Sequence, residues 1–199
     1  MDVKKLWITW LLMAAFFILG DFMHISNFHN DLHTAKVAEK IALDVLIGTT
    51  ENYAFEDVSD IKEMWHMGDI IAKKDDGEYW YIDVKDDSRI ADTHNILCED
   101  KVYYRKQAEF KDGFMHSGYN FLAIVSQPEK KIYIVNFDKL RKHYKEGERR
   151  EMHYSWQYSV CYLFPLKLAY KYNMIEAEIE YDNEGSTEYY PLTCKKYYH

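Results

Sequence analysis

The 199-residue chain has little proline, glycine or cysteine, with 3 Pro, 8 Gly and 3 Cys. Because 48% of its residues are hydrophobic, this composition excludes disordered, collagen-like and low-complexity proteins. Cys98, Cys161 and Cys194 are too few and too far apart for a disulfide scaffold or a zinc ribbon. Their odd number is typical of a reducing compartment, so we expect a cytoplasmic protein.

The chain also lacks an uncharged run of the roughly 20 residues that a membrane-spanning helix needs. Its most apolar uncharged run is Leu6–Leu19, preceded by Lys4 and Lys5. Four interpretations stay open for it: a membrane anchor, an uncleaved signal, a helix that packs on a protein, or an over-extended gene start. We expect an apolar helix over residues 1–24, with membrane contact through residues 6–19 if it is an anchor. An extracytoplasmic binding protein is the alternative if it is a signal.

Charge is unevenly distributed along the chain, although the net charge of −8 by itself argues against a nucleic-acid binder. Residues 51–100 carry 5 basic and 15 acidic side chains, whereas residues 101–150 carry 12 basic and 6 acidic ones. The acidic quarter is therefore a candidate for metal binding. The basic quarter is a candidate for contact with phosphate groups.

The order of the expected elements predicts a single α/β domain over residues 25–199 with a mixed central sheet. Apolar residues at helical spacing predict a helix over residues 31–46, ended by Gly48. Two β-rich runs around Asp75-Asp76-Gly77 predict a β-hairpin. We expect further strands at 95–98, 119–126, 131–137, 158–164 and 175–182, and further helices at 100–111, 138–146 and 165–172.

Three ionisable side chains fall together on this hairpin. Counting outward from its turn places Asp69 opposite Ile82 or Asp83, and in the second register the two aspartates lie within about 5 Å of each other. Lys85 shares the face of Asp83 because strand side chains alternate. Two such carboxylates with a lysine suit a divalent cation and metal-assisted hydrolysis of a phosphodiester. The alternative is an exposed strand face with a screened ion pair.

Glu39 lies within the apolar stripe of the predicted helix, beside Ala35, Ala42 and Leu46. A carboxylate directed at a core is costly unless it is paired or bound to metal. We therefore expect Glu39 to belong to the same site as the hairpin aspartates. The alternative is a residue at the helix edge that pairs with Lys36.

Glu39 in a helix, followed by Asp69 and by Asp83-Val84-Lys85, resembles the PD-(D/E)XK nuclease superfamily. The resemblance implies a restriction-endonuclease-like αβββαβ core, flanked by helices, within residues 31–126. It implies that Asp69, Asp83, the Val84 carbonyl and Glu39 hold Mg²⁺ or Mn²⁺, and that Lys85 is the catalytic lysine. The chain departs from the motif at Gly68, where proline is usual, and in the added acids Asp86 and Asp87.

We therefore expect a metal-dependent endodeoxyribonuclease, and a homodimer by analogy with nucleases that cut two strands. The alternative is a catalytically silent DNA- or protein-binding module on the same fold. Aromatic and basic side chains together can grip a nucleic-acid backbone, although an ordinary solvated helix face explains them equally well. The residues expected to contact DNA are Tyr104, Arg105, Lys106, Arg141 and Lys142.

Overall fold

The computed structural model describes residues 32–50, 52–153 and 157–182. The predicted apolar helix of residues 1–24 lies outside these ranges. Residues Ala38–His199 form one compact unit of the chain. A helix covers residues 32–49, so the prediction of 31–46 is confirmed, although the helix continues past Gly48. Among the described residues, no helix is long and apolar enough to span a membrane.

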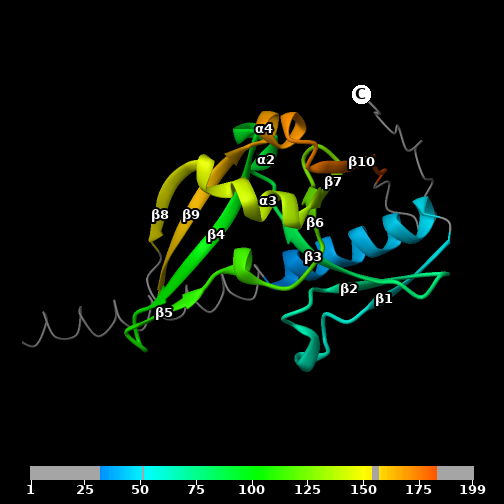
Figure 1. The fold of residues 1–199 in the computed structure, drawn as a ribbon, viewed down its shortest axis with the longest axis horizontal. Coiled ribbons are helices and arrows are strands. Elements are labelled where there is room, and N and C mark those ends of the chain that lie inside the picture. Colours follow the sequence, from blue (N-terminus) through cyan, green and yellow to red (C-terminus); the bar gives the residue numbers. More distant parts are fainter. Residues whose placement is uncertain (1–31, 51, 154–156, 183–199) are drawn as a thin grey trace, which may run out of the picture. The chain divides into compact units, whose positions relative to one another are not determined.

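A mixed six-stranded sheet forms the centre of this unit, in the order β1-β2-β3-β6-β7-β10 (Figure 1). Neighbouring strands are antiparallel except for β3 and β6, which are parallel. The mixed sheet and its hairpin were predicted, whereas β1 was not. The strands are β1 (Tyr53–Asp57), β2 (Ile70–Lys74), β3 (Tyr79–Asp86), β6 (Phe121–Ser126), β7 (Lys131–Asn136) and β10 (Ile175–Glu180).

Both faces of this sheet are covered, which explains the nearly continuous apolar sequence of its central strands. On β6, Ala123 and Val125 face one side, whereas Leu122 and Ile124 face the other. The first side packs against the helix of residues 32–49, which contributes five buried side chains. These are Ala38, Ile41, Ala42, Val45 and Leu46.

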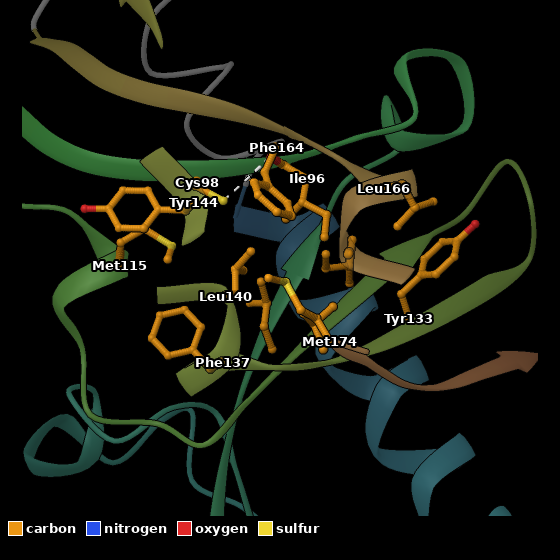
Figure 2. Packing of buried hydrophobic residues seen from close by; sticks show 14 of the residues in the cluster. Ile96, Cys98, Met115, Tyr133, Phe137, Leu140, Tyr144, Phe164, Leu166 and Met174 are labelled. Carbon is orange, nitrogen blue, oxygen red and sulfur yellow. Dashed lines mark hydrogen bonds between the residues drawn. The ribbon is translucent and has the colours of Figure 1, made fainter. Parts of the chain in front are cut away.

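The other face packs against short helices and a second, four-stranded antiparallel sheet in the order β5-β4-β9-β8. Figure 2 shows this layer, where Ile96 and Cys98 from β4 lie beside Phe164 from β9 and Leu140 from α3. Its strands are β4 (Asn95–Tyr104), β5 (Glu109–Asp112), β8 (Glu148–His153) and β9 (Gln157–Pro165). Its helices are α2 (Ile90–Thr93), α3 (Phe137–His143) and α4 (Leu166–Lys171), with the 3-10 turns η1 (Lys62–Met64), η2 (Phe114–His116) and η3 (Tyr144–Glu146).

The helix predicted over residues 100–111 is wrong, because that segment is the end of β4, a turn and β5. Tyr103 explains the difference, since its ring lies 4.9 Å from Phe110 and 5.0 Å from Tyr158. Cross-strand aromatic pairs of this kind stabilise a sheet. The strand predicted at 95–98 does exist but belongs to the second sheet. The predicted αβββαβ assignment is therefore wrong in detail. The three strands after the first helix are β1, β2 and β3, and no long helix precedes β6 within the described residues.

Gly68 precedes β2 at the point where the hairpin opens, and its φ is +114°. A Cβ atom at this position would lie 2.6 Å from the Ile82 carbonyl oxygen, well inside van der Waals contact. Proline holds φ near −65°, so it cannot adopt this conformation. The departure from the proline of the nuclease motif is therefore a consequence of the local backbone.

We predict that Gly68→Ala lowers the free energy of unfolding by about 1–3 kcal/mol, because it adds backbone strain and a clash with the neighbouring strand. Gly48→Ala is the matched control, since a Cβ at Gly48 meets nothing within 4 Å and its residue lies in a helix. That control should be neutral or stabilising by up to about 1 kcal/mol. Urea unfolding followed by circular dichroism measures both changes, and equal stability of the two variants would contradict the prediction.

Candidate active site

The β2–β3 hairpin places Asp69 at its open end, beside the segment of β3 that carries Asp83. Ile70 pairs with Ile82, and the Asp69 N–H also donates a hydrogen bond of 2.9 Å to the Ile82 carbonyl. The Asp69 carboxylate accepts a hydrogen bond of 2.7 Å from the Val84 backbone N–H. Because the amide and carbonyl of one strand residue point to the same edge, the Val84 carbonyl also faces the side on which Asp69 lies.

Asp83 and Lys85 project from β3 on the face opposite the helix of residues 32–49, because Val84 between them packs toward that helix. Asp83 is buried, with 7% of its surface exposed. The Lys85 Nζ lies 2.6 Å from Asp83 Oδ2 and 5.5 Å from the centre of the Phe114 ring. The alternative of an exposed, screened pair is therefore wrong for Asp83, although the Lys85 side chain reaches solvent.

Electrostatic interactions connect Asp69 with Asp83, Lys85 and Glu39. Burial, followed by the charges of Asp83 and Glu39, raises the pKa of Asp69 to about 6 against the opposing Val84 hydrogen bond and Lys85. Burial by itself would lower the pKa of Lys85, but the carboxylates around it, Asp83 first among them, hold that pKa above its usual value. Among these interactions, the effect of Glu39 on Asp69 is the smallest.

Two residues near this site were not predicted. Glu99 from β4 accepts a hydrogen bond of 2.8 Å from the Ser159 hydroxyl, and its carboxylate is one of those that act on Lys85. Burial raises the pKa of Glu99 above its usual value. Tyr119 donates a hydrogen bond of 3.2 Å to the Phe114 carbonyl. Burial, followed by the charges of Asp83 and Asp69, raises the pKa of Tyr119.

The additional acids Asp86 and Asp87 have separate structural contacts. Asp86 accepts a hydrogen bond of 3.0 Å from Gln127 Nε2, and alternation along β3 directs it to the face opposite Asp83. Asp87 lies in the turn before α2, where its side chain accepts a hydrogen bond of 3.1 Å from the Arg89 backbone N–H. Neither contact involves the candidate site, so these acids leave its composition unchanged.

The residues expected to contact DNA lie in two places. Tyr104 ends β4 and Arg105 and Lys106 follow in an exposed turn, about 17 Å along the strand from Glu99. They are therefore on a hairpin tip and not on the predicted helix. Arg141 and Lys142 lie on α3, where Arg141 donates a hydrogen bond of 2.9 Å to the Ser117 carbonyl and pairs with Asp138.

The donor set of the site suits a hard divalent cation. Asp69, Asp83 and the Val84 carbonyl offer oxygen atoms, the ligands that Mg²⁺ and Mn²⁺ prefer. The buried Oδ2 of Asp83 is ion-paired with Lys85. Within the described part of the chain it accepts no hydrogen bond with favourable geometry. Across residues 32–50, 52–153 and 157–182, no three His, Cys, Asp or Glu side chains already converge to hold a metal. The carbonyl or waters would therefore have to complete the coordination.

A cavity of about 620 Å³ lies elsewhere, on the helix face of the six-stranded sheet. Leu46 from the helix and the aromatic side chains of Tyr53, Trp80 and Phe121 line part of it. None of the four predicted catalytic residues belongs to its lining. The carboxylates and Lys85 therefore form a site apart from this apolar cavity.

No known protein family matches the chain, and no curated protein is similar to it in sequence. Among solved structures, the bacterial homing endonuclease I-Ssp6803I is similar, with a TM-score of 0.40 and 9% sequence identity. The match covers 63% of this chain and 74% of the endonuclease. A similarity of this size does not establish a shared fold, so the functional argument depends on the geometry described above.

We predict that Asp69→Asn stabilises the metal-free protein at pH 8 by about 1–3 kcal/mol, because ionised Asp69 is unfavourable in the folded state. A folded pKa of about 6 lies above the ordinary value of 3.8, so wild-type stability falls as the pH rises between them. At pH 3.5 the two proteins should therefore be nearly equally stable. Urea unfolding at both pH values measures this, with exposed Asp112→Asn as control. A gain that is equal at both pH values would contradict it.

Proposed function

We propose that the protein is a metal-dependent endodeoxyribonuclease that hydrolyses DNA phosphodiester bonds at the end of the β2–β3 hairpin. One observation carries the proposal: Lys85 is ion-paired with a buried Asp83 beside an Asp69 carboxylate that is hydrogen-bonded to Val84. This arrangement combines two carboxylates, a backbone carbonyl and a cation in one place. It also agrees with the PD-(D/E)XK resemblance of the same residues.

The residues of the chain would divide the work by charge. The Lys85 ammonium can donate hydrogen bonds to a non-bridging phosphate oxygen and stabilise the negative charge that develops there. Asp83 holds Lys85 in place through the 2.6 Å ion pair. Asp69 is held in place by the Val84 N–H, which keeps its carboxylate beside Asp83 as a candidate metal ligand. Glu39 favours the proton-bound form of Asp69 through its charge.

Mg²⁺, or Mn²⁺ as a substitute, would be held by Asp69, Asp83 and the Val84 carbonyl, with Glu39 orienting the set through its charge on Asp69. Such an ion supplies Lewis-acid stabilisation of the phosphoryl oxygens and lowers the pKa of a coordinated water. It also offsets the repulsion between carboxylates that Lys85 alone leaves uncompensated. A homodimer that presents two such sites to the two DNA strands stays a prediction.

The test is cleavage of plasmid and branched DNA with Mg²⁺ or Mn²⁺ by the full chain. We expect Asp83→Ala to abolish cleavage and Lys85→Ala to reduce the rate by about 100-fold or more, because each removes a charge that acts on the reacting phosphate. The hairpin offers matched controls in Lys74 and Asp76, an exposed ion pair of 2.7 Å at its other end. Lys74→Ala and Asp76→Ala should cleave normally. Metal-dependent cleavage that survives the changes at Asp83 and Lys85 would refute the proposal.

A second candidate is a catalytically silent binding module on the same fold. The observation in its favour is that Lys85 already neutralises Asp83 at 2.6 Å without a metal. The two candidates differ in metal affinity, which calorimetric titration with Mn²⁺ measures. The nuclease should bind Mn²⁺ and lose that binding in Asp83→Ala, whereas the silent module should release no heat in either protein.

A further inference from the structure

Asp100 is a buried carboxylate outside the candidate active site, with 6% of its surface exposed. It lies on β4 at an irregularity in the pairing with β9, between Glu99 and Lys101. Bulges of this kind redirect a side chain and are common near functional sites. The Asp100 carbonyl also accepts a hydrogen bond of 2.8 Å from the Gly113 N–H, which brings the turn η2 against β4.

Three donors from two other elements converge on one oxygen of this carboxylate. Tyr144 OH lies 2.5 Å from Oδ1, His116 Nε2 lies 2.9 Å from it, and Lys145 Nζ lies 3.7 Å from it. Burial by itself would raise the pKa of Asp100, but the hydrogen bonds from Tyr144 and His116 hold that pKa below its usual value. Asp100 is therefore an anion that holds an imidazole and an ammonium side by side. We name these four residues the Asp100 cluster.

The His116 and Lys145 side chains are accessible although the Asp100 carboxylate that holds them is not. The His116 side chain is 39% exposed and that of Lys145 is 60% exposed. Another pair on the same part of the chain shows what a simple surface contact looks like. His143 and Glu146 lie 2.7 Å apart, and both side chains are well exposed. The buried anchor thus distinguishes His116 from His143.

The Asp100 cluster adjoins the candidate active site through two elements. On β4, Asp100 directly follows Glu99, whose carboxylate acts on Lys85. On η2, His116 follows two residues after Phe114, whose ring lies 5.5 Å from Lys85 Nζ. A DNA backbone bound at Lys85 would therefore have its neighbouring phosphates within reach of this surface.

We propose that His116 and Lys145, held by Asp100, bind a second phosphate of the DNA backbone next to the one at Lys85. The proposal rests on the function proposed above and names the part of the surface along which the DNA lies. His116 Nε2 is engaged by Asp100, so its other ring nitrogen and the Lys145 ammonium supply the donors. Contacts to backbone phosphates position DNA without reading its sequence.

Two arginines lie close to the Asp100 cluster. Arg149 on β8 is coupled to Asp100 by charge. On α3, Arg141 donates a hydrogen bond to the carbonyl of Ser117, the residue after His116, and is also paired with Asp138.

The test measures affinity of the full-length protein for a fluorescent DNA duplex by anisotropy, with Ca²⁺ in place of Mg²⁺ to keep the duplex intact. Affinity is measured over a range of NaCl concentrations at pH 6. The variants are His116→Gln, which can still donate a hydrogen bond to Asp100, and Lys145→Gln. The matched controls are His143→Gln and Lys167→Gln, the latter an exposed residue of α4. Thermal unfolding checks that each variant folds.

We expect each variant of the Asp100 cluster to make the dependence of log Kd on log salt shallower by about 1, the loss of one phosphate contact. Wild-type slopes for His116→Gln and Lys145→Gln, or equal changes in the controls, would overturn the second phosphate position and leave the nuclease proposal standing. Absence of DNA binding by the wild-type protein would contradict both.

Discussion

The hydrogen bond from the Val84 amide to the Asp69 carboxylate determines how the rest of the candidate site is arranged. β2 begins at Ile70, so backbone pairing with β3 ends before it reaches Val84. The side chain of Asp69 supplies the missing acceptor, at 2.7 Å. The same bond holds the Asp69 carboxylate beside the buried Asp83, and burial, followed by the charge of Asp83, raises the pKa of Asp69 to about 6. The hydrogen bond that satisfies the Val84 amide therefore also brings the carboxylates of Asp69 and Asp83 together, which is unfavourable.

β4 connects this unfavourable pair to the second half of the domain. It pairs with β9 in the four-stranded sheet and shifts register between Glu99 and Lys101. Glu99 acts on Lys85, and the next residue, Asp100, holds His116 and Lys145. A single strand thus serves the Lys85 site and the Asp100 cluster together. Because the connection is covalent, displacement of β4 would disturb both sites at once.

The parts of this arrangement that follow from local rules could be predicted from the sequence. The Asp75-Asp76-Gly77 turn predicts the hairpin, and counting from it brings Asp69 next to the segment of β3 that begins at Ile82. Helical periodicity places Glu39 on the side of its helix where its charge acts on Asp69. Glu99 and Asp100 could not be found in this way, because their positions depend on a bulge and on packing between distant segments. The error over residues 100–111 has the same origin, since Tyr103 joins a sheet through Phe110 and Tyr158.

The charge of the site favours a bound cation over a silent module. Asp69, Asp83 and Glu99 all act on Lys85, so one ammonium faces three carboxylates, and Glu39 adds to the negative charge that acts on Asp69. Without a metal, the protein reduces this excess by holding a proton on Asp69 below a pH of about 6. Above that pH the excess returns, and a divalent cation between Asp69 and Asp83 would remove it through oxygen ligands of the preferred kind. A module that only binds DNA would gain nothing from this excess, because unpaired carboxylates repel phosphate groups.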